Sequence, residues 1–200
     1  GGGMDGGGAG VSECADVILE FLEAAVHVIL YSREIYPKEL FERKKLYGVE
    51  VWKSRHPDLN EYIYSHVESL KGWVERGAVE KVAVPILGRD HSVVERFVFE
   101  FKVDRTPEGA RRPLRDLQDA LRAFLLKITW VEGSLRKLPP DCTFEIVAYS
   151  LERDAGAIWV DEDRTDGRVE IPGAELIPIK SWAQGPVRMQ AYAEAPRLHW

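Results

Sequence analysis

The sequence is short of cysteine, of long uncharged apolar runs and of positive charge. Its two cysteines, Cys14 and Cys142, cannot form a disulfide framework, which favours a reducing compartment. The longest apolar stretch is interrupted by Glu20, Glu23 and His27, so it is shorter than the roughly 18 uncharged residues that a membrane-spanning helix needs. The sequence therefore argues against a disulfide-rich secreted domain and against a helical membrane protein.

Acidic residues outnumber basic ones, 33 to 27, which gives a formal net charge of −6. Nucleic-acid binding needs a basic face, so we expect no direct nucleic-acid contact, and we expect any link to DNA to run through a partner protein. Hydrophobic residues make up 45% of the 200 residues and charged residues 30%, which is ordinary for one globular domain with a real core.

Patterns of catalysis and metal binding are also missing. The sequence has no G-x-S-x-G turn, no P-loop and no H-E-x-x-H pair, and its five histidines are scattered. The acidic stretch 161–166 resembles a calcium loop, but Pro172 stands where that loop needs its glutamate. We therefore expect no metal, no cofactor and no catalysis. One alternative stays open, a small thiol hydrolase in which Cys142 pairs with His56 or His66.

Three segments have the apolar spacing of amphipathic helices. Residues 12–36 carry a polar stripe only about 80° wide, which predicts a helix that is buried on most sides and ended by the proline that follows. Residues 57–76 carry a second apolar stripe, stopped by Gly77, and residues 113–131 carry a third. The first helix is expected to be the spine of the domain.

Strand patterns occupy most of the remaining chain. Residues 41–55 predict a loop and a short strand, residues 79–87 and 93–101 a hairpin, and residues 141–149 another strand. Pro85 inside the hairpin suggests an edge position or a bulge. Three runs in the last fifty residues predict further strands joined by irregular crossings: AIWV, ELIPIKSW and VRMQAYAE. This order predicts an α+β fold, with helices packed against a mostly antiparallel sheet.

Two local features are unusual for a plain domain. Trp159 lies between small residues and an acidic stretch, where it either anchors the tail to the sheet or forms one wall of a groove for an apolar or proline-rich segment. Arg43, Lys44 and Lys45 form a short basic cluster. A surface patch is the commonest interpretation of such a cluster, and a weak nuclear signal or a contact surface are the alternatives.

Seven motifs in one order resemble those of the HORMA domain family. ILYSREIYP (29–37) and FERKKLYGV (41–49) resemble the opening signature of the family. Five more are similar to one branch, the mitotic arrest deficient-like type B proteins, which are non-catalytic subunits of translesion DNA polymerase zeta: HPDLNEYI (56–63), VERFVFEF (94–101), LRAFLLKI (121–128), LIPIKS (176–181) and RMQAY (188–192). The similarity spans about residues 13–194.

The resemblance implies a HORMA-like fold, in which three helices back a sheet and a C-terminal β segment acts as a mobile safety belt. After a flexible Gly-rich tail at 1–11, we expect a single domain at 12–200, with its core at 12–149, its belt at 150–194 and a short tail at 195–200. In such proteins the belt wraps over a partner's peptide that adds to the sheet as a strand, so release must wait until the belt undocks.

The resemblance also implies two binding surfaces. Tyr62 and Trp159 resemble residues that flank a captured proline-containing peptide of the polymerase zeta catalytic subunit. Leu176, Gln190 and Tyr192 resemble a belt surface that binds the C-terminal domain of a scaffold polymerase, a deoxycytidyl transferase. The side-chain period of two places Gln190 and Tyr192 on one face of their strand, and Leu176 joins them if its strand is the neighbour.

A third surface is implied for pairing with another HORMA protomer, at Glu34, Arg43 and Arg122. Arg122 points away from the apolar stripe of its helix, as such a role requires. A AAA+ remodelling ATPase is a further partner that the family implies. Ala191 and Ala193 depart from the larger apolar residues of the family, and we expect Ala191 to point into the core.

These observations predict a non-catalytic adaptor in the nucleus. It would bridge the polymerase zeta catalytic subunit to the scaffold polymerase in translesion synthesis and DNA damage tolerance. A HORMA adaptor of the spindle checkpoint or of the meiotic chromosome axis is the alternative within the family, and the thiol hydrolase is the distant one.

Overall fold

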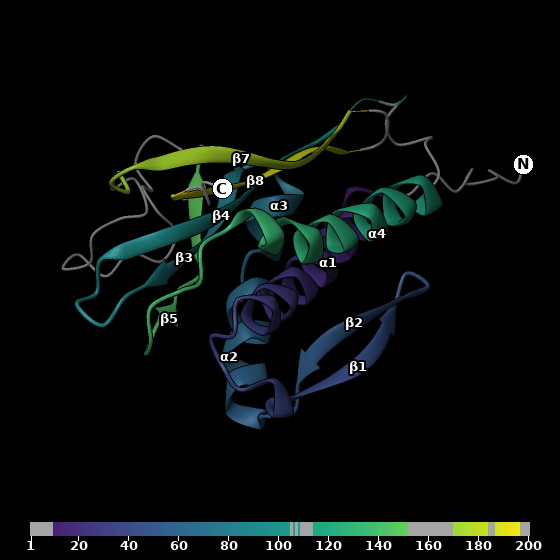
Figure 1. Ribbon diagram of the computed structural model, residues 1–200. Coiled ribbons are helices and arrows are strands. Elements are labelled where there is room, and N and C mark those ends of the chain that lie inside the picture. Colours follow the sequence, from purple (N-terminus) through teal and green to yellow (C-terminus); the bar gives the residue numbers. More distant parts are fainter. Residues whose placement is uncertain are drawn as a thin grey trace, which may run out of the picture.

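The protein is described here from a computed structural model, in which helices pack on a sheet and on a separate hairpin (Figure 1). The structure describes residues 10–104, 106, 108, 114–151, 170–183 and 187–196. Its helices are α1 (Val11–Ser32), α2 (Pro57–Glu68), α3 (Lys71–Glu75) and α4 (Leu114–Val131), with short 3-10 turns at Lys38–Leu40 and Glu132–Ser134.

The strands form one hairpin and one larger sheet. The hairpin consists of β1 (Phe41–Leu46) and β2 (Val49–Ser54). The sheet consists of β3 (Val79–Leu87), β4 (Val93–Val103), β5 (Thr143–Phe144), β6 (Val147–Ser150), β7 (Ala174–Trp182) and β8 (Val187–Pro196). Its order is β5-β3-β4-β8-β7, with β6 also on β3, and these pairs are antiparallel. The predicted α+β class is confirmed.

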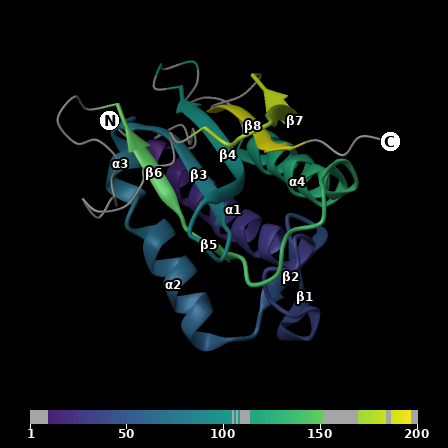
Figure 2. The same cartoon turned by 60° about the vertical axis from the view of Figure 1, so that its left-hand side comes forward.

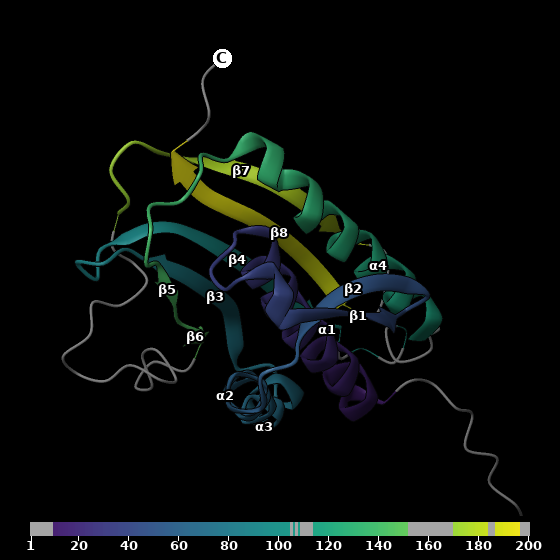
Figure 3. The same cartoon turned by 60° about the horizontal axis from the view of Figure 1, so that its bottom comes forward.

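The two long helices define the main core. α1 and α4 lie against one face of the sheet, and the β1–β2 hairpin lies on the far side of α1 (Figures 1 and 3). Phe21 of α1 meets Phe99 of β4 and Phe124 of α4 edge to face, at centroid distances of 5.7 and 6.0 Å. The opposite face of the sheet carries a smaller buried cluster: Ala83, Val98, Val147, Tyr149 and Tyr192.

α1 is buried along most of its length, as the narrow polar stripe predicts, but it ends at Ser32 rather than at residue 36. Glu34 adopts a left-handed φ of 53°, and its N–H bonds to the Tyr31 carbonyl at 3.1 Å. The Ile35 N–H bonds to the Leu30 carbonyl at 3.1 Å, which completes a Schellman cap. The cap ends the helix, and the proline lies beyond it.

The second predicted helix is divided between Ser69 and Leu70 into α2 and α3, but its apolar stripe is correct. All five residues of that stripe are buried: Leu59, Ile63, Val67, Leu70 and Val74. His56 caps α2 by accepting the Leu59 N–H at 3.3 Å, and Gly77 follows α3 with a φ of 69° that suits glycine. The predicted helix at 113–131 is confirmed as α4.

Residues 41–55 were expected to hold a loop and one short strand, and this prediction is wrong. Both halves are strands, joined by a two-residue turn in which Tyr47 and Gly48 have φ values of 50° and 75°. Positive φ at both positions is typical of a type I′ hairpin turn. The basic cluster Arg43–Lys45 lies in β1, where exposed charges on a strand mask its period of two.

Pro85 lies in an interior strand rather than at an edge, because β3 pairs with β4 on one side and with β5 and β6 on the other. The Pro85 carbonyl accepts the Glu145 N–H at 3.0 Å, so the position of its missing N–H also faces β5 and β6. The neighbouring strand is interrupted at this point, between Phe144 and Val147. The sheet therefore accommodates the proline by breaking the strand beside it.

Candidate functional site

The two predicted belt strands form a hairpin on the β4 edge of the sheet. β8 pairs with β4, and β7 pairs with β8, so the runs ELIPIKSW and VRMQAYAE are neighbours as predicted. Leu176 lies opposite Glu194, which places it on the same face as Gln190 and Tyr192. Ala191 points into the main core and is 1% exposed, also as predicted.

The three predicted second-partner residues are not equally available on that face. Leu176 is 54% exposed and Gln190 is exposed, whereas Tyr192 is buried in the small cluster of the outer face. The Tyr192 hydroxyl donates to Glu100 Oε1 at 3.0 Å, and burial raises the pKa of this phenol. Tyr192 therefore covers the sheet, and Leu176 and Gln190 offer the accessible contacts.

An ion pair fixes this hairpin to the rest of the sheet. Arg96 of β4 lies opposite Glu194 of β8, and Arg96 Nη1 is 2.8 Å from Glu194 Oε2. The Arg96 side chain is almost completely buried. An Arg–carboxylate pair that is shielded from water is worth more than an exposed one, so it strengthens the docking of β8.

The opposite edge of the sheet lies beside an aromatic groove. Phe144 of β5 meets Tyr62 of α2 and Tyr36 edge to face, at centroid distances of 5.8 and 6.4 Å. These side chains, with Leu40 and Leu59, line a cavity of about 400 Å³. Within the described ranges, no strand pairs with the outer edges of β5 and β6. Figure 2 shows this edge running past the end of α2. An extended peptide therefore has unpaired backbone groups and an aromatic pocket side by side.

The predicted partner of Tyr62, Trp159, lies outside the described residues. Tyr62 itself is 37% exposed and packs against His66 with the two rings tilted by 41°, at a centroid distance of 4.1 Å. The aromatic residues Tyr36 and Phe144 were not predicted as site residues. Tyr36 closes the motif ILYSREIYP, but single aromatic residues give no periodic signal of a shared groove.

The three predicted dimer residues come from separate elements. Glu34 caps α1 and pairs with Lys38 at 3.5 Å, while Arg43 lies over the Trp52 ring and pairs with Glu50 at 3.3 Å. Arg122 is exposed on α4, as predicted. The same helix also exposes Leu126 and Trp130, at steps of four from Arg122. The i, i+4, i+8 spacing of these three residues is visible in the sequence, but the predicted apolar stripe included only the buried face of the helix.

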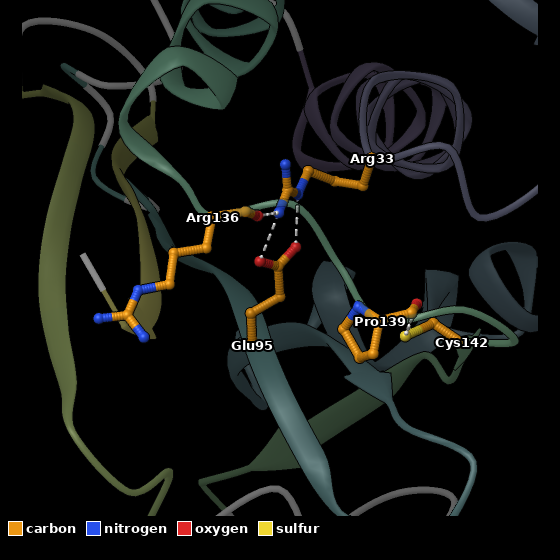
Figure 4. Close-up of polar contacts among 5 residues, drawn as sticks. All are labelled: Arg33, Glu95, Arg136, Pro139 and Cys142. Atoms are coloured by element: carbon orange, nitrogen blue, oxygen red, sulfur yellow. Dashed lines mark hydrogen bonds and ion pairs between the residues drawn. The ribbon is translucent and has the colours of Figure 1, made fainter. Parts of the chain in front are cut away.

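A buried ion pair at the end of α1 was missed by the sequence analysis. Arg33 Nε and Nη2 donate to the two Glu95 oxygens at 2.7 and 3.0 Å, and Nη2 also donates to the Arg136 carbonyl (Figure 4). Burial raises the pKa of Glu95, and the Arg33 guanidinium opposes that rise. The pair ties α1 to the central strand β4 and to the segment after α4.

Cys142 does not form the catalytic pair that was left open. It lies in the turn before β5, partly exposed rather than buried, and its Sγ donates to the Pro139 carbonyl at 3.2 Å (Figure 4). Desolvation and the nearby Glu95 raise its thiol pKa, which favours an inert protonated thiol. His56 and His66 both use Nδ1 in bonds to the α2 backbone.

The described residues contain no group of three His, Cys, Asp or Glu side chains that could hold a metal ion. Among the same residues, no helix is both long enough and apolar enough to cross a membrane. Two accessible surfaces of the described sheet are candidate sites: the β5–β6 edge beside the aromatic groove, and the docked C-terminal hairpin with its exposed Leu176 and Gln190.

This architecture defines a class of fold in which a C-terminal hairpin docks on one edge of a helix-backed sheet. Residues 14–151 match the HORMA domain family. The chain is 39% identical over 191 residues to the mitotic spindle assembly checkpoint protein MAD2B of Bos taurus, covering 90% of each chain. It is 33% identical to the DNA polymerase zeta processivity subunit of Arabidopsis thaliana, covering 93% of this chain and 87% of that protein.

A solved chain of the mitotic checkpoint complex superimposes with a TM-score of 0.76 at 25% identity, over 91% of this chain and 98% of that one. The chain belongs to the HORMA domain family. Its fold and its resemblance to polymerase zeta subunits are therefore confirmed, and so is its assignment to an adaptor family rather than to enzymes.

Proposed function

We propose that this protein is a nuclear adaptor that joins two proteins of translesion synthesis. At the β5–β6 edge it captures a proline-containing peptide of the polymerase zeta catalytic subunit, and through β7 and β8 it binds the C-terminal domain of the scaffold deoxycytidyl transferase. The relative named as a polymerase zeta processivity subunit supports this assignment. A HORMA dimer and a AAA+ remodelling ATPase complete the proposed set of partners.

One observation carries the proposal: the C-terminal hairpin occupies the β4 side of the sheet, while no strand from the described part of the chain covers the β5–β6 side beside the Tyr62–Phe144 groove. A peptide added there gains main-chain hydrogen bonds from β6 and apolar contacts from the aromatic rings. Proline suits such a groove, because its fixed φ lowers the entropy lost on ordering.

The segment between β6 and β7 completes the proposed clamp. β6 pairs with β3 at one side of the sheet, and β7 lies at the other side, with β3, β4 and β8 between the two strands. In our proposal the chain that connects these two strands passes over the bound peptide. A peptide held in this way leaves only after the crossing segment moves, so its dissociation is slow relative to its contact area.

The test of peptide capture is calorimetric titration with a proline-containing peptide of the polymerase zeta catalytic subunit. Tyr62→Ala should weaken binding by about 1–2 kcal/mol, the usual contribution of an aromatic anchor. Tyr64→Ala is the matched control, because Tyr64 is on the same helix, 49% exposed and outside the groove. Equal loss in both variants, or none in either, would contradict the assigned groove.

The second surface is tested with the C-terminal domain of the scaffold polymerase. A combined Leu176→Ala and Gln190→Ala change should abolish that binding and leave peptide capture intact, because the two surfaces lie on different sides of the sheet. Tyr192 is kept in this test, since its removal would open the buried cluster of the outer face. Loss of both partners together would contradict the two-site bridge.

A spindle-checkpoint role is the second candidate, and the MAD2B relatives and the mitotic checkpoint complex favour it. The same titration separates the two candidates when a peptide from a checkpoint partner replaces the polymerase peptide. Preferential capture of the checkpoint peptide would assign the open edge to the spindle checkpoint instead.

A further inference from the structure

A large cavity lies at one end of the sheet, away from the aromatic groove. Its volume is about 980 Å³, and it is bordered by α3, by the end of β4 and by the start of β8. Phe101 and Met189 are among the residues that line it, but both are buried and their side chains point into the main core, whereas Leu151, which is 61% exposed, stands at its rim. Neither the proposed peptide groove nor the Arg33–Glu95 pair reaches this cavity.

Two cations face each other at the mouth of this cavity. Lys102 of β4 lies directly opposite Arg188 of β8, on the same face of the sheet. Both are exposed, and neither makes an ion pair with another described residue. Like charges directly opposite each other on a sheet destabilise it. The other end of the same ladder shows the favourable arrangement, because Arg96 there lies opposite Glu194 in an ion pair.

The other charged residues of the cavity do not neutralise the positive charge of Lys102 and Arg188. Arg76 also lines the cavity, with its guanidinium 4.0 Å from the Trp73 ring centroid. The acidic groups of the lining are Glu80 and Glu100, and the Glu100 carboxylate already accepts the Tyr192 hydroxyl. Three cations thus outnumber two carboxylates in a chain whose net charge is −6. This end of the sheet therefore carries a local excess of positive charge on an acidic protein.

We propose that this cavity is a third docking site, for an acidic segment of a partner protein. Carboxylates of the segment pair with Lys102 and Arg188, and an adjacent apolar side chain packs on the exposed Leu151 at the rim. Charge complementarity identifies the occupant, because a carboxylate between the two cations removes their mutual repulsion. The inference goes beyond the two-site bridge, since neither surface of that bridge requires it.

A protein segment suits this site better than a nucleic acid does. Glu80 and Glu100 would repel a continuous phosphate backbone, whereas a peptide can place its carboxylates next to the cations only. The exposed Leu151 side chain at the rim also favours a peptide side chain. Gln190 lines both this cavity and the proposed second-partner surface, so a partner bound there can extend an acidic segment into the cavity.

The experiment uses the full chain and a short fluorescein-labelled peptide of Asp, Glu and Leu, followed by fluorescence anisotropy. Lys102→Glu turns the like-charge pair into an opposite-charge pair, so it should raise the melting temperature and weaken peptide binding at least about tenfold. A gain in stability combined with a loss of binding distinguishes a docking site from a merely structural residue. The raised melting temperature also shows that the variant is folded.

Lys45→Glu is the matched control, because Lys45 is also an exposed strand lysine without an ion pair among the described residues. It should bind the peptide as the wild type does. The proposal is overturned if both lysine variants lose binding equally, which would indicate general charge attraction, or if neither loses it. A DNA oligonucleotide and an unlabelled copy of the peptide are compared as competitors of the labelled peptide. If the DNA displaces it at the lower concentration, the site binds nucleic acid, and the proposal is overturned as well.

Discussion

The two edges of the sheet have the same backbone chemistry and opposite protection. The β7 edge contains Pro178, which offers no N–H, and its register with β8 shifts between Pro178 and Lys180. The β5–β6 edge has neither proline nor lysine from residue 143 to residue 150. Proline, lysine and irregular register are the usual means by which proteins prevent unwanted strand pairing. One edge is therefore closed to strand addition, and the other is left open.

The open edge is nevertheless short, and this limits what it can bind. β5 has two residues and β6 has four, and the strand is interrupted between them, beside Pro85. Such an edge gives few main-chain hydrogen bonds, so a bound strand needs the side-chain pocket beside it. The aromatic groove at Tyr62 and Phe144 supplies that pocket. For the peptide capture that we propose, selectivity at this edge would therefore come from the groove and not from the strand.

The largest effect is expected from loosening β4, the strand that stands between the two edges. Glu95→Ala leaves the buried Arg33 guanidinium without its carboxylate. An unpaired buried charge costs about 3–5 kcal/mol, so urea unfolding should show a loss of that size. Peptide capture and hairpin docking should weaken together, because both depend on β4 and its neighbours.

Two variants isolate the cause of that loss. Glu50→Ala removes a Glu–Arg pair that is exposed, and it should cost less than about 1 kcal/mol. Replacing both Arg33 and Glu95 by Met and Leu should cost less than Glu95→Ala alone, since no charge then remains buried. A double change as costly as the single one would show that packing, and not the orphaned charge, sets the energy.

What the sequence predicted depended on whether the signal was local. The stripe of Leu59, Ile63 and Val67 and the alternation around Gln190 and Tyr192 follow directly from the helix and strand periods, and the structure places them as expected. The Arg33–Glu95 pair joins residues 62 positions apart, and no period links them. The groove at Tyr62 was predicted from family resemblance, but its partner Phe144 depends on how β5 is placed beside α2.

An intermediate effect is expected at His27, which belongs to α1 and faces β2, away from both edges of the sheet. Its Nδ1 accepts the Ser54 N–H at 3.1 Å, and burial, aided by Lys53, lowers its pKa to about 4. In the unfolded chain His27 has the ordinary histidine pKa of about 6.5, so the unfolded state takes up the proton at a higher pH than the folded state does. The free energy of unfolding therefore falls as the pH drops from 6.5 towards 4. The free energy of unfolding should drop by about 2 kcal/mol from pH 7 to pH 5 through this group.

His27→Asn tests this drop, because the Asn side-chain oxygen can still accept the Ser54 N–H and does not titrate. Urea unfolding of both proteins at pH 7 and pH 5 subtracts the titration of all other groups. The variant should have the smaller pH dependence by about 2 kcal/mol. Identical pH dependence in the two proteins would show that His27 is not the buried neutral group that the fold implies.

The smallest effect on the monomer is expected from removing the protection of the β7 edge. Replacing Pro178 and Lys180 with Thr gives the strand an additional N–H and removes its charge, at a change in monomer stability below about 1 kcal/mol. The consequence should instead be association, seen in sedimentation velocity as a concentration-dependent dimer. Ser181→Thr, on the same strand, keeps both protective residues and should stay monomeric under the same conditions. If the Pro178 and Lys180 variant also stayed monomeric, its two side chains would not be what closes this edge, and the contrast with β5 and β6 would lie in strand geometry alone.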